Sequence, residues 1–215
     1  MSLDALIGAT ERLLAVHGPT LVRVAARSIE HGLAFEAPLR VRVEDFDPAL
    51  AEPGACFVTL RLRAARADED DLRGCIGSVA ARRPLIEDVA HNAFGAAFRD
   101  PRFDPLRADE LDRLDLSLSV LSPLVPLPFV NEADLIAKIR PGVDGVMIGD
   151  AHHQGLFLPS VWAQLPAARD FVRHLKRKAG LSFEASLEGF HAERFVTAHV
   201  DAGCLPSGEP LWRTG

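Results

Sequence analysis

The 215-residue sequence has little cysteine, little lysine and no long apolar segment. Its three cysteines, Cys56, Cys75 and Cys204, form no CxxC pair, so neither a disulfide framework nor a zinc knuckle is indicated. No apolar run approaches the ~20 residues needed to cross a bilayer, and the N-terminus has no basic-then-apolar signal pattern. These absences predict a soluble, reduced protein of the cytoplasm with no membrane segment.

The charge balance also excludes function classes. A net charge of −6 argues against a general nucleic-acid binder, which is usually basic. The eight histidines form no H-E-x-x-H motif, and the adjacent His152 and His153 point apart on a strand or turn. We therefore expect no metal site, no cofactor and no nucleic-acid partner.

What is present is an ordinary globular composition, 48% hydrophobic and 25% charged, on a chain long enough to bury a core. Alternating apolar residues predict strands, at 55–62, 72–79, 114–121, 145–149, 155–158 and 194–200. Capping and apolar faces predict helices, at 20–32, 84–97, 132–139 and 166–179. The strands at 55–62 and 72–79 read as a hairpin with an acidic tip at 66–71.

Because these strand pairs are hairpin-like, we predict an α+β fold, mainly antiparallel sheet with flanking helices. Residues 1–200 are expected to form a single domain with room for two lobes, divided near 121–142. A mobile tail is expected over 201–215, which is rich in Pro and Gly.

The segment 72–77 carries the most chemistry in the fewest residues. Leu72 and Ile76 are the natural core side of a strand, so Arg73 and Cys75 should share the opposite face. Two positions along a strand span about 7 Å, which places a fixed cation close to a thiol. This pair is the candidate centre of a functional site.

Gly74 and Gly77 flank the cysteine, and they should leave the backbone uncovered for a ligand or another chain. Cys75 can be a nucleophile or redox thiol, with the charge of Arg73 favouring the thiolate. It can equally be a small buried hydrophobe. A nucleophile needs a base, for which His91 on the following helix is the nearest candidate in sequence.

Four polar residues complete the candidate ligand-binding set. Arg73 and Arg102 can bind a carboxylate or phosphate bidentately, or pair with an acid, as Arg102 could with Asp100 or Asp104. Asn92 can contact a ligand or bond the backbone of the neighbouring 72–77 strand. Asp100 precedes a proline and is typical of an Asx turn.

The hexapeptide LRGCIG at 72–77 resembles the signature of the AMMECR family, called AmmeMemoRadiSam system protein A in bacteria and archaea. Further segments are similar to the family pattern, at 54–60, 92–93, 96–103, 117–121, 142–148, 155–159 and 178–181. The resemblance runs from about Leu21 to Val200. It departs from the family pattern at Ser160, at Gln164 and at the Leu165-Pro166 helix entry.

The resemblance implies a two-lobed α+β fold with a cleft along the 72–77 strand. It also implies association with a Memo-like protein and a radical SAM protein, but no established reaction. We favour a binding or adaptor component whose cleft holds a small anionic ligand or a partner segment, since no complete catalytic constellation is visible. The alternative is a thiol-dependent enzyme using Cys75 on a small substrate, with Arg73 positioning an anionic group.

Overall fold

The computed structural model describes residues 3–63, 72–205 and 210–212; the expected acidic tip at 66–71 and parts of the expected tail lie outside them. Within these ranges the helices are α1 (Leu3–Phe35), α2 (Pro48–Ala51), α3 (Leu85–Phe98), α4 (Glu132–Lys138) and α5 (Ala168–Lys178). The strands are β1 (Pro53–Leu62), β2 (Leu72–Gly77), β3 (Arg83–Pro84), β4 (Leu114–Leu121), β5 (Val125–Pro126), β6 (Gly145–Gly149), β7 (Gln154–Phe157), β8 (His191–Phe195) and β9 (Thr197–Asp201).

The chain divides into two compact units. The larger unit comprises Ala9–Leu121 and Ala198–Gly215, and the smaller unit comprises Met1–Gly8 and Ser122–Thr197. Each has its own cluster of buried apolar side chains. The expectation of a single domain over residues 1–200 stays a prediction.

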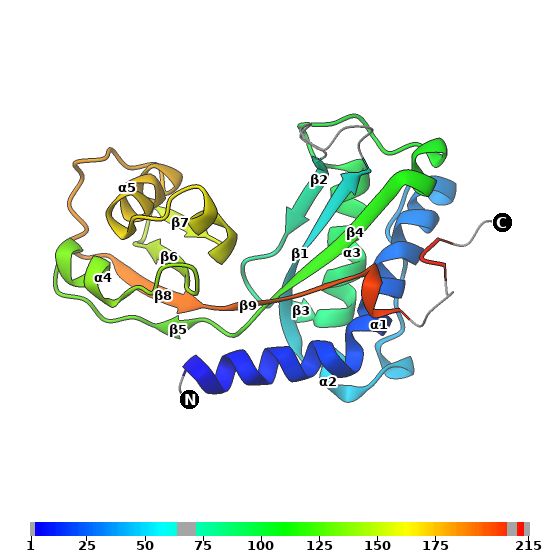
Figure 1. Ribbon diagram of the computed structural model, residues 1–215, viewed down its shortest axis with the longest axis horizontal. Helices are drawn as coiled ribbons and strands as arrows, with labels where there is room; N and C mark the ends of the chain where they lie inside the picture. Colours follow the sequence, from blue (N-terminus) through cyan, green and yellow to red (C-terminus); the bar gives the residue numbers. More distant parts are fainter. Residues whose placement is uncertain (1–2, 64–71, 206–209, 213–215) are drawn as a thin grey trace. The chain divides into compact units, whose positions relative to one another are not determined.

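The larger unit is built on a sheet with strand order β2-β1-β4-β9, in which β3 also pairs with β1 (Figure 1). β1 is antiparallel to both β2 and β4, so the predicted hairpin is confirmed. In the middle of β1 every second residue is fully buried: Cys56, Val58 and Leu60 point into the core. Helix α3 packs against β1 and β2 and supplies much of that core.

The smaller unit has a sheet of strand order β5-β8-β6-β7, in which each pair of neighbouring strands is antiparallel. Asn131 begins α4 as a side-chain cap, accepting a hydrogen bond from the Asp134 N–H at 2.9 Å. α5 buries its apolar face at Phe171, Val172 and Leu175. With helices flanking both sheets, the predicted α+β class with mainly antiparallel strands is confirmed.

Two predicted elements are wrong in their extent. The helix expected at 20–32 is the second part of α1, which continues through Pro19 although proline cannot donate the backbone hydrogen bond there. Gly32 lies inside this helix and does not end it. The strand expected at 194–200 is two strands, because β8 joins one sheet and β9 the other.

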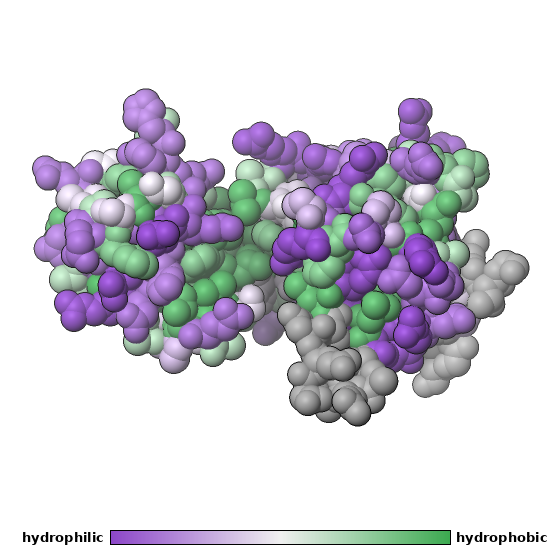
Figure 2. All heavy atoms as spheres, turned by 90° about the horizontal axis from the view of Figure 1, so that it is seen from above, coloured by the Kyte–Doolittle hydropathy of each residue, from purple (hydrophilic) through white to green (hydrophobic). Residues whose placement is uncertain are grey.

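Among the described residues, no helix is both long and apolar enough to cross a membrane. On the face shown in Figure 2, hydrophilic and hydrophobic residues are interspersed on each unit. Such mixing is usual, since polar groups alone cannot cover a folded chain.

Candidate functional site

The two faces of β2 are occupied as the sequence pattern predicts. Gly74 and Ile76 face α3: a Cβ on Gly74 would lie 2.0 Å from the Ala96 carbonyl oxygen, and Ile76 contacts Gly95. Because side chains alternate along a strand, Arg73 and Cys75 lie on the opposite face of the sheet.

The glycines of β2 do not leave the backbone open. Gly74 is covered by the backbone of α3, whose Ala96 carbonyl leaves no space for a side chain. Gly77 lies under the ring of Phe57, which a Cβ would approach to 2.3 Å. The expectation that a ligand or another chain reaches the backbone here is therefore wrong, because both positions are filled by this chain itself.

Arg73 is held in an ion pair. Its Nε and Nη2 donate to the two carboxylate oxygens of Glu110, in the short helix Ala108–Arg113, at 2.7 and 3.1 Å. The side chains are only 11% and 15% exposed. The Arg73 hydrogen bonds lower the pKa of Glu110. This pairing, rather than an approach to the thiol, occupies the guanidinium.

Cys75 is partly buried and unpaired with any other cysteine. The Thr59 hydroxyl on the neighbouring strand donates to its sulfur at 3.4 Å. His91 is exposed on α3, which covers the other face of the sheet. Partial burial and the nearby Arg83 lower the pKa of His91. The structure therefore does not bring the candidate nucleophile and its candidate base together.

Asp100 and Arg102 close the outer edge of β2. Asp100 Oδ2 accepts from the Cys75 N–H at 2.8 Å, and Arg102 Nη2 donates to the Cys75 carbonyl at 3.4 Å. The two side chains are themselves paired at 2.7 Å, which lowers the pKa of Asp100. Asp100 also accepts from the Arg102 N–H, forming the expected Asx turn. The pair therefore satisfies the backbone N–H and C=O of Cys75, as a further strand would at this edge.

Asn92 does not bond the backbone of β2, so that expectation is wrong. Its amide nitrogen donates to the Cys56 carbonyl of β1 at 3.1 Å and to Asp88 at 2.9 Å. It also lies 3.2 Å from the Ser78 hydroxyl, just beyond the end of β2. Asn92 therefore ties α3 to β1 and points toward Asp88, a carboxylate that the sequence analysis missed.

Asp88 is the most buried of the described acids in the larger unit, only 1% exposed. One carboxylate oxygen accepts from the Cys56 N–H at 3.0 Å and the other from the Ser78 hydroxyl at 2.7 Å. The Arg83 Nε lies 3.6 Å away. Burial raises the pKa of the Cys56 thiol, and the negative charge of Asp88 raises it further. The signal in the sequence is Asp88 and Asn92 four residues apart within an apolar helix face.

A cavity of about 260 Å³ opens beside this carboxylate, at the end of β2. Its lining includes the Ser78 hydroxyl, Arg82 and Arg83. Arg82 is exposed, and the Arg83 side chain is 40% exposed. Since Asp88 balances one guanidinium, the cavity keeps about one positive charge, which suits a carboxylate or phosphate group. No cluster of three or more His, Cys, Asp or Glu suited to a metal occurs in the described part of the chain.

Comparison with known proteins gives one consistent result. The AMMECR1 family model matches residues 22–200. A protein of Methanothermobacter thermautotrophicus is 37% identical over 165 residues, covering 76% of this chain and 82% of its own. Protein MJ0810 of Methanocaldococcus jannaschii is 33% identical over 203 residues, covering 93% and 97%.

The fold has a solved counterpart. The crystal structure of protein PH0010 from Pyrococcus horikoshii superposes with a TM-score of 0.74 at 32% identity, covering 85% of this chain and 89% of that one. The family model spans most of the sequence, and the relatives match over most of their own lengths. This chain belongs to the AMMECR1 family.

Proposed function

We propose that the protein is a binding or adaptor component that acts with a Memo-like protein and a radical SAM protein. It holds a small anionic ligand, or an acidic segment of a partner, in the cavity at the end of β2. The association with these partners rests on the family resemblance. The observation that carries the ligand class is the pair of guanidinium groups beside the Ser78 hydroxyl and the buried Asp88.

The polar groups around this cavity are already oriented. Ser78 and Arg83 both contact Asp88, so their positions are set before a ligand arrives. Arg82 lies beside them on the exposed rim. An incoming carboxylate or phosphate meets Arg82 without having to break an existing contact with Asp88. This arrangement supports binding more than catalysis, because the Asp88 carboxylate that accepts from Ser78 is also held by the Cys56 N–H and the Asn92 amide.

The test is a binding measurement with the purified Memo-like and radical SAM proteins of the same genome, and with inorganic phosphate as a small-anion probe. Arg82→Glu should weaken binding about tenfold or more, because it reverses a rim charge that receives the anion. Arg40→Glu, which reverses an exposed arginine of the same unit, is the matched control and should change binding less than about twofold.

Three outcomes decide the proposal. Loss of binding by Arg82→Glu alone supports the cavity as the binding site. Equal loss in both variants would show a general charge effect and reject the cavity. If neither protein nor phosphate binds the unaltered chain, the adaptor function is rejected.

A thiol-dependent enzyme is the second candidate, and the partial exposure of Cys75 is the observation in its favour. It requires Cys75 to react with iodoacetamide below pH 8 much faster than an ordinary cysteine does. Cys56 is the internal control: it is fully buried and burial raises its pKa, so it should be labelled only after unfolding. Slow alkylation of Cys75 would remove this candidate.

A further inference from the structure

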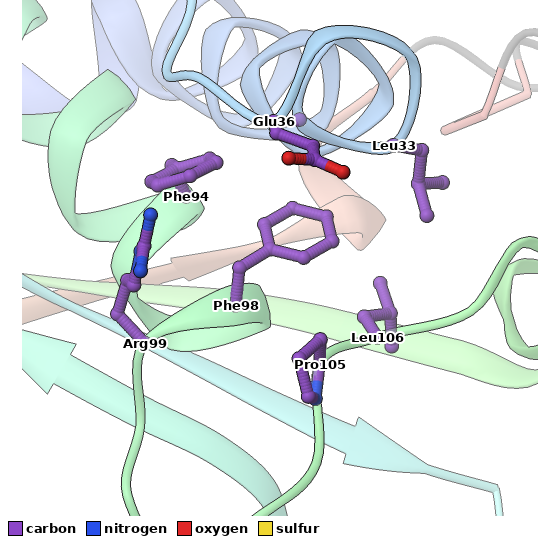
Figure 3. Close-up of a pocket in the computed structure, with 8 residues that line it drawn as sticks. Leu33, Glu36, Phe94, Phe98, Arg99, Pro105 and Leu106 are labelled. Atoms are coloured by element: carbon purple, nitrogen blue, oxygen red, sulfur yellow. The ribbon is translucent and has the colours of Figure 1, made fainter.

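A second cavity in the larger unit is lined differently from the one at the end of β2. It has a volume of about 350 Å³ and lies where the C-terminal ends of α1 and α3 meet (Figure 3). Five apolar side chains line it: Leu33, Phe94, Phe98, Pro105 and Leu106. Phe94 and Leu106 are almost fully buried, so this lining belongs to the folded core. The size is that of a small-molecule site.

One wall of the cavity forms where residue 32 of α1, which has no side chain, packs on two phenylalanine rings. A Cβ on Gly32 would lie 2.3 Å from the Phe98 ring and 2.8 Å from the Phe94 ring. The two rings are tilted neighbours, with centroids 5.1 Å apart. The glycine therefore lets the helix close onto the aromatic pair, which forms a rigid apolar wall.

Two side chains of opposite charge, Glu36 and Arg99, also line this cavity. Glu36 follows the last residue of α1 and, in Figure 3, directs its carboxylate toward the Phe98 ring. The Arg99 guanidinium lies over Phe94, 5.7 Å from the ring centroid. Within the described ranges, neither side chain has an ion-pair partner, and the two do not pair with each other.

The backbone of Glu36 is strained. Its φ is +55°, and among the described residues no other non-glycine residue has a positive φ. The position follows a helix, where glycine is the usual residue, and its N–H donates to the Gly32 carbonyl at 2.9 Å. A glutamate held in this conformation points to a role for its carboxylate, since strain of this kind gathers at binding sites.

We infer that this cavity binds a small zwitterion with an apolar body, of the class of a free apolar α-amino acid. The Glu36 carboxylate receives the ammonium group, assisted by the adjacent ring faces. The Arg99 guanidinium receives the carboxylate. The side chain of the ligand lies against Phe98, Leu33 and Leu106. This site is separate from the cavity at the end of β2 and does not depend on the proposed adaptor function.

The test compares ligands that differ by one charge, using calorimetry and the ligand-dependent unfolding temperature of the full chain. The probes are L-leucine, its amine 3-methylbutylamine and its acid 4-methylpentanoate, with L-methionine and L-phenylalanine as further zwitterions. The zwitterions should bind at least about tenfold more tightly than either singly charged analogue, because each analogue can form only one of the two charge contacts. No binding by any of the three amino acids at millimolar concentration would overturn the proposal.

Charge-neutral variants test which residue binds the ammonium group of the ligand and which binds its carboxylate. Glu36→Gln should weaken the binding of the zwitterions and of the amine about tenfold and leave the binding of the acid unchanged. Arg99→Gln should weaken the binding of the zwitterions and of the acid and leave the binding of the amine unchanged. Equal affinity of all variants for leucine would place the ligand elsewhere and overturn the assignment.

Glu36→Gly separates binding from folding. Glycine adopts positive φ without strain, so this variant should unfold at a higher temperature than the unaltered chain. It should also lose leucine binding at least tenfold, since the carboxylate is gone. A variant that is more stable and still binds normally would contradict the role of Glu36.

Discussion

At the scale of single residues, close packing explains the glycines of β2 better than ligand access does. Gly74 lies against backbone, the Ala96 carbonyl, whereas Gly77 lies against a side chain, the Phe57 ring. Backbone in a packed helix moves much less easily than a ring on a sheet surface. The two positions should therefore differ in how they tolerate a methyl group.

We predict that Gly74→Ala lowers the free energy of unfolding by about 2–3 kcal/mol, because α3 must move away from β2. Gly77→Ala should lower it by only about 1 kcal/mol, because the Phe57 ring can turn aside. Urea unfolding of both variants measures the difference. A larger loss for Gly77→Ala would contradict this account.

Asp88 is the residue whose loss should matter most to the candidate anion cavity. In Asp88→Asn, the carboxylate charge beside Arg83 is lost, and one of the two oxygens that accept from the Cys56 N–H and the Ser78 hydroxyl is replaced by a donor. Since the site is buried, we predict a loss of about 2–4 kcal/mol in unfolding free energy.

Asp104→Asn is the matched control, because Asp104 is exposed in the same unit. It should change the unfolding free energy by less than about 0.5 kcal/mol. Equal effects of the two substitutions in chemical denaturation would show that the Asp88 network contributes nothing specific.

At the scale of elements, an ion pair closes the edge of β2. The pKa of Asp100 is lowered mainly by its hydrogen bonds to Arg102, with the Cys75 N–H adding to the effect. A carboxyl with a lowered folded-state pKa stabilises the fold above its unfolded pKa, near 4, and that stabilisation is lost as the pH falls further.

We therefore predict that the edge of β2 weakens in acid. As the pH falls below about 4 toward the lowered folded-state pKa of Asp100, the protection of the Cys75 amide against hydrogen exchange should decrease, because protonation of Asp100 removes the acceptor of this N–H. In Arg102→Gln the change should begin at higher pH, because the pKa of Asp100 returns toward its ordinary value. An identical pH profile in both proteins, followed by NMR, would refute the assignment.

The bounds of the elements also show which structural features the local sequence pattern predicts. The bounds of β4 and the cap of α4 follow from alternation and from Asn131, because both depend on neighbouring residues. The break between β8 and β9 does not follow, because the 194–200 segment reads as one strand. Only the pairing of its two parts with different sheets decides where it divides.

At the scale of the whole molecule, the two compact units have separate cores and one tryptophan each. Trp162 is buried in the smaller unit, stacked on Phe171 with ring centroids 3.8 Å apart. Trp212 is buried in the larger unit and donates to the Leu114 carbonyl. Each tryptophan can therefore report the unfolding of its own unit.

We predict that Phe171→Ala destabilises the smaller unit by about 3–4 kcal/mol, because it leaves a cavity beside Trp162. The fluorescence transition of Trp162 should shift to lower urea. The transition of Trp212 should move by less than about 0.5 kcal/mol, since its core shares no residue with Phe171. Single-tryptophan variants separate the signals; a common shift would mean that the two units unfold together.

The sequence by itself determined most of the strands and helices, the α+β class and the face of β2 on which Arg73 and Cys75 lie, because these depend on residues two to four positions apart. The tertiary structure alone decided which charges are paired. Arg73 meets Glu110 37 positions away, and Cys56 meets Asp88 32 positions away. Such partners are chosen by how helices pack on a sheet, and no local pattern records that choice.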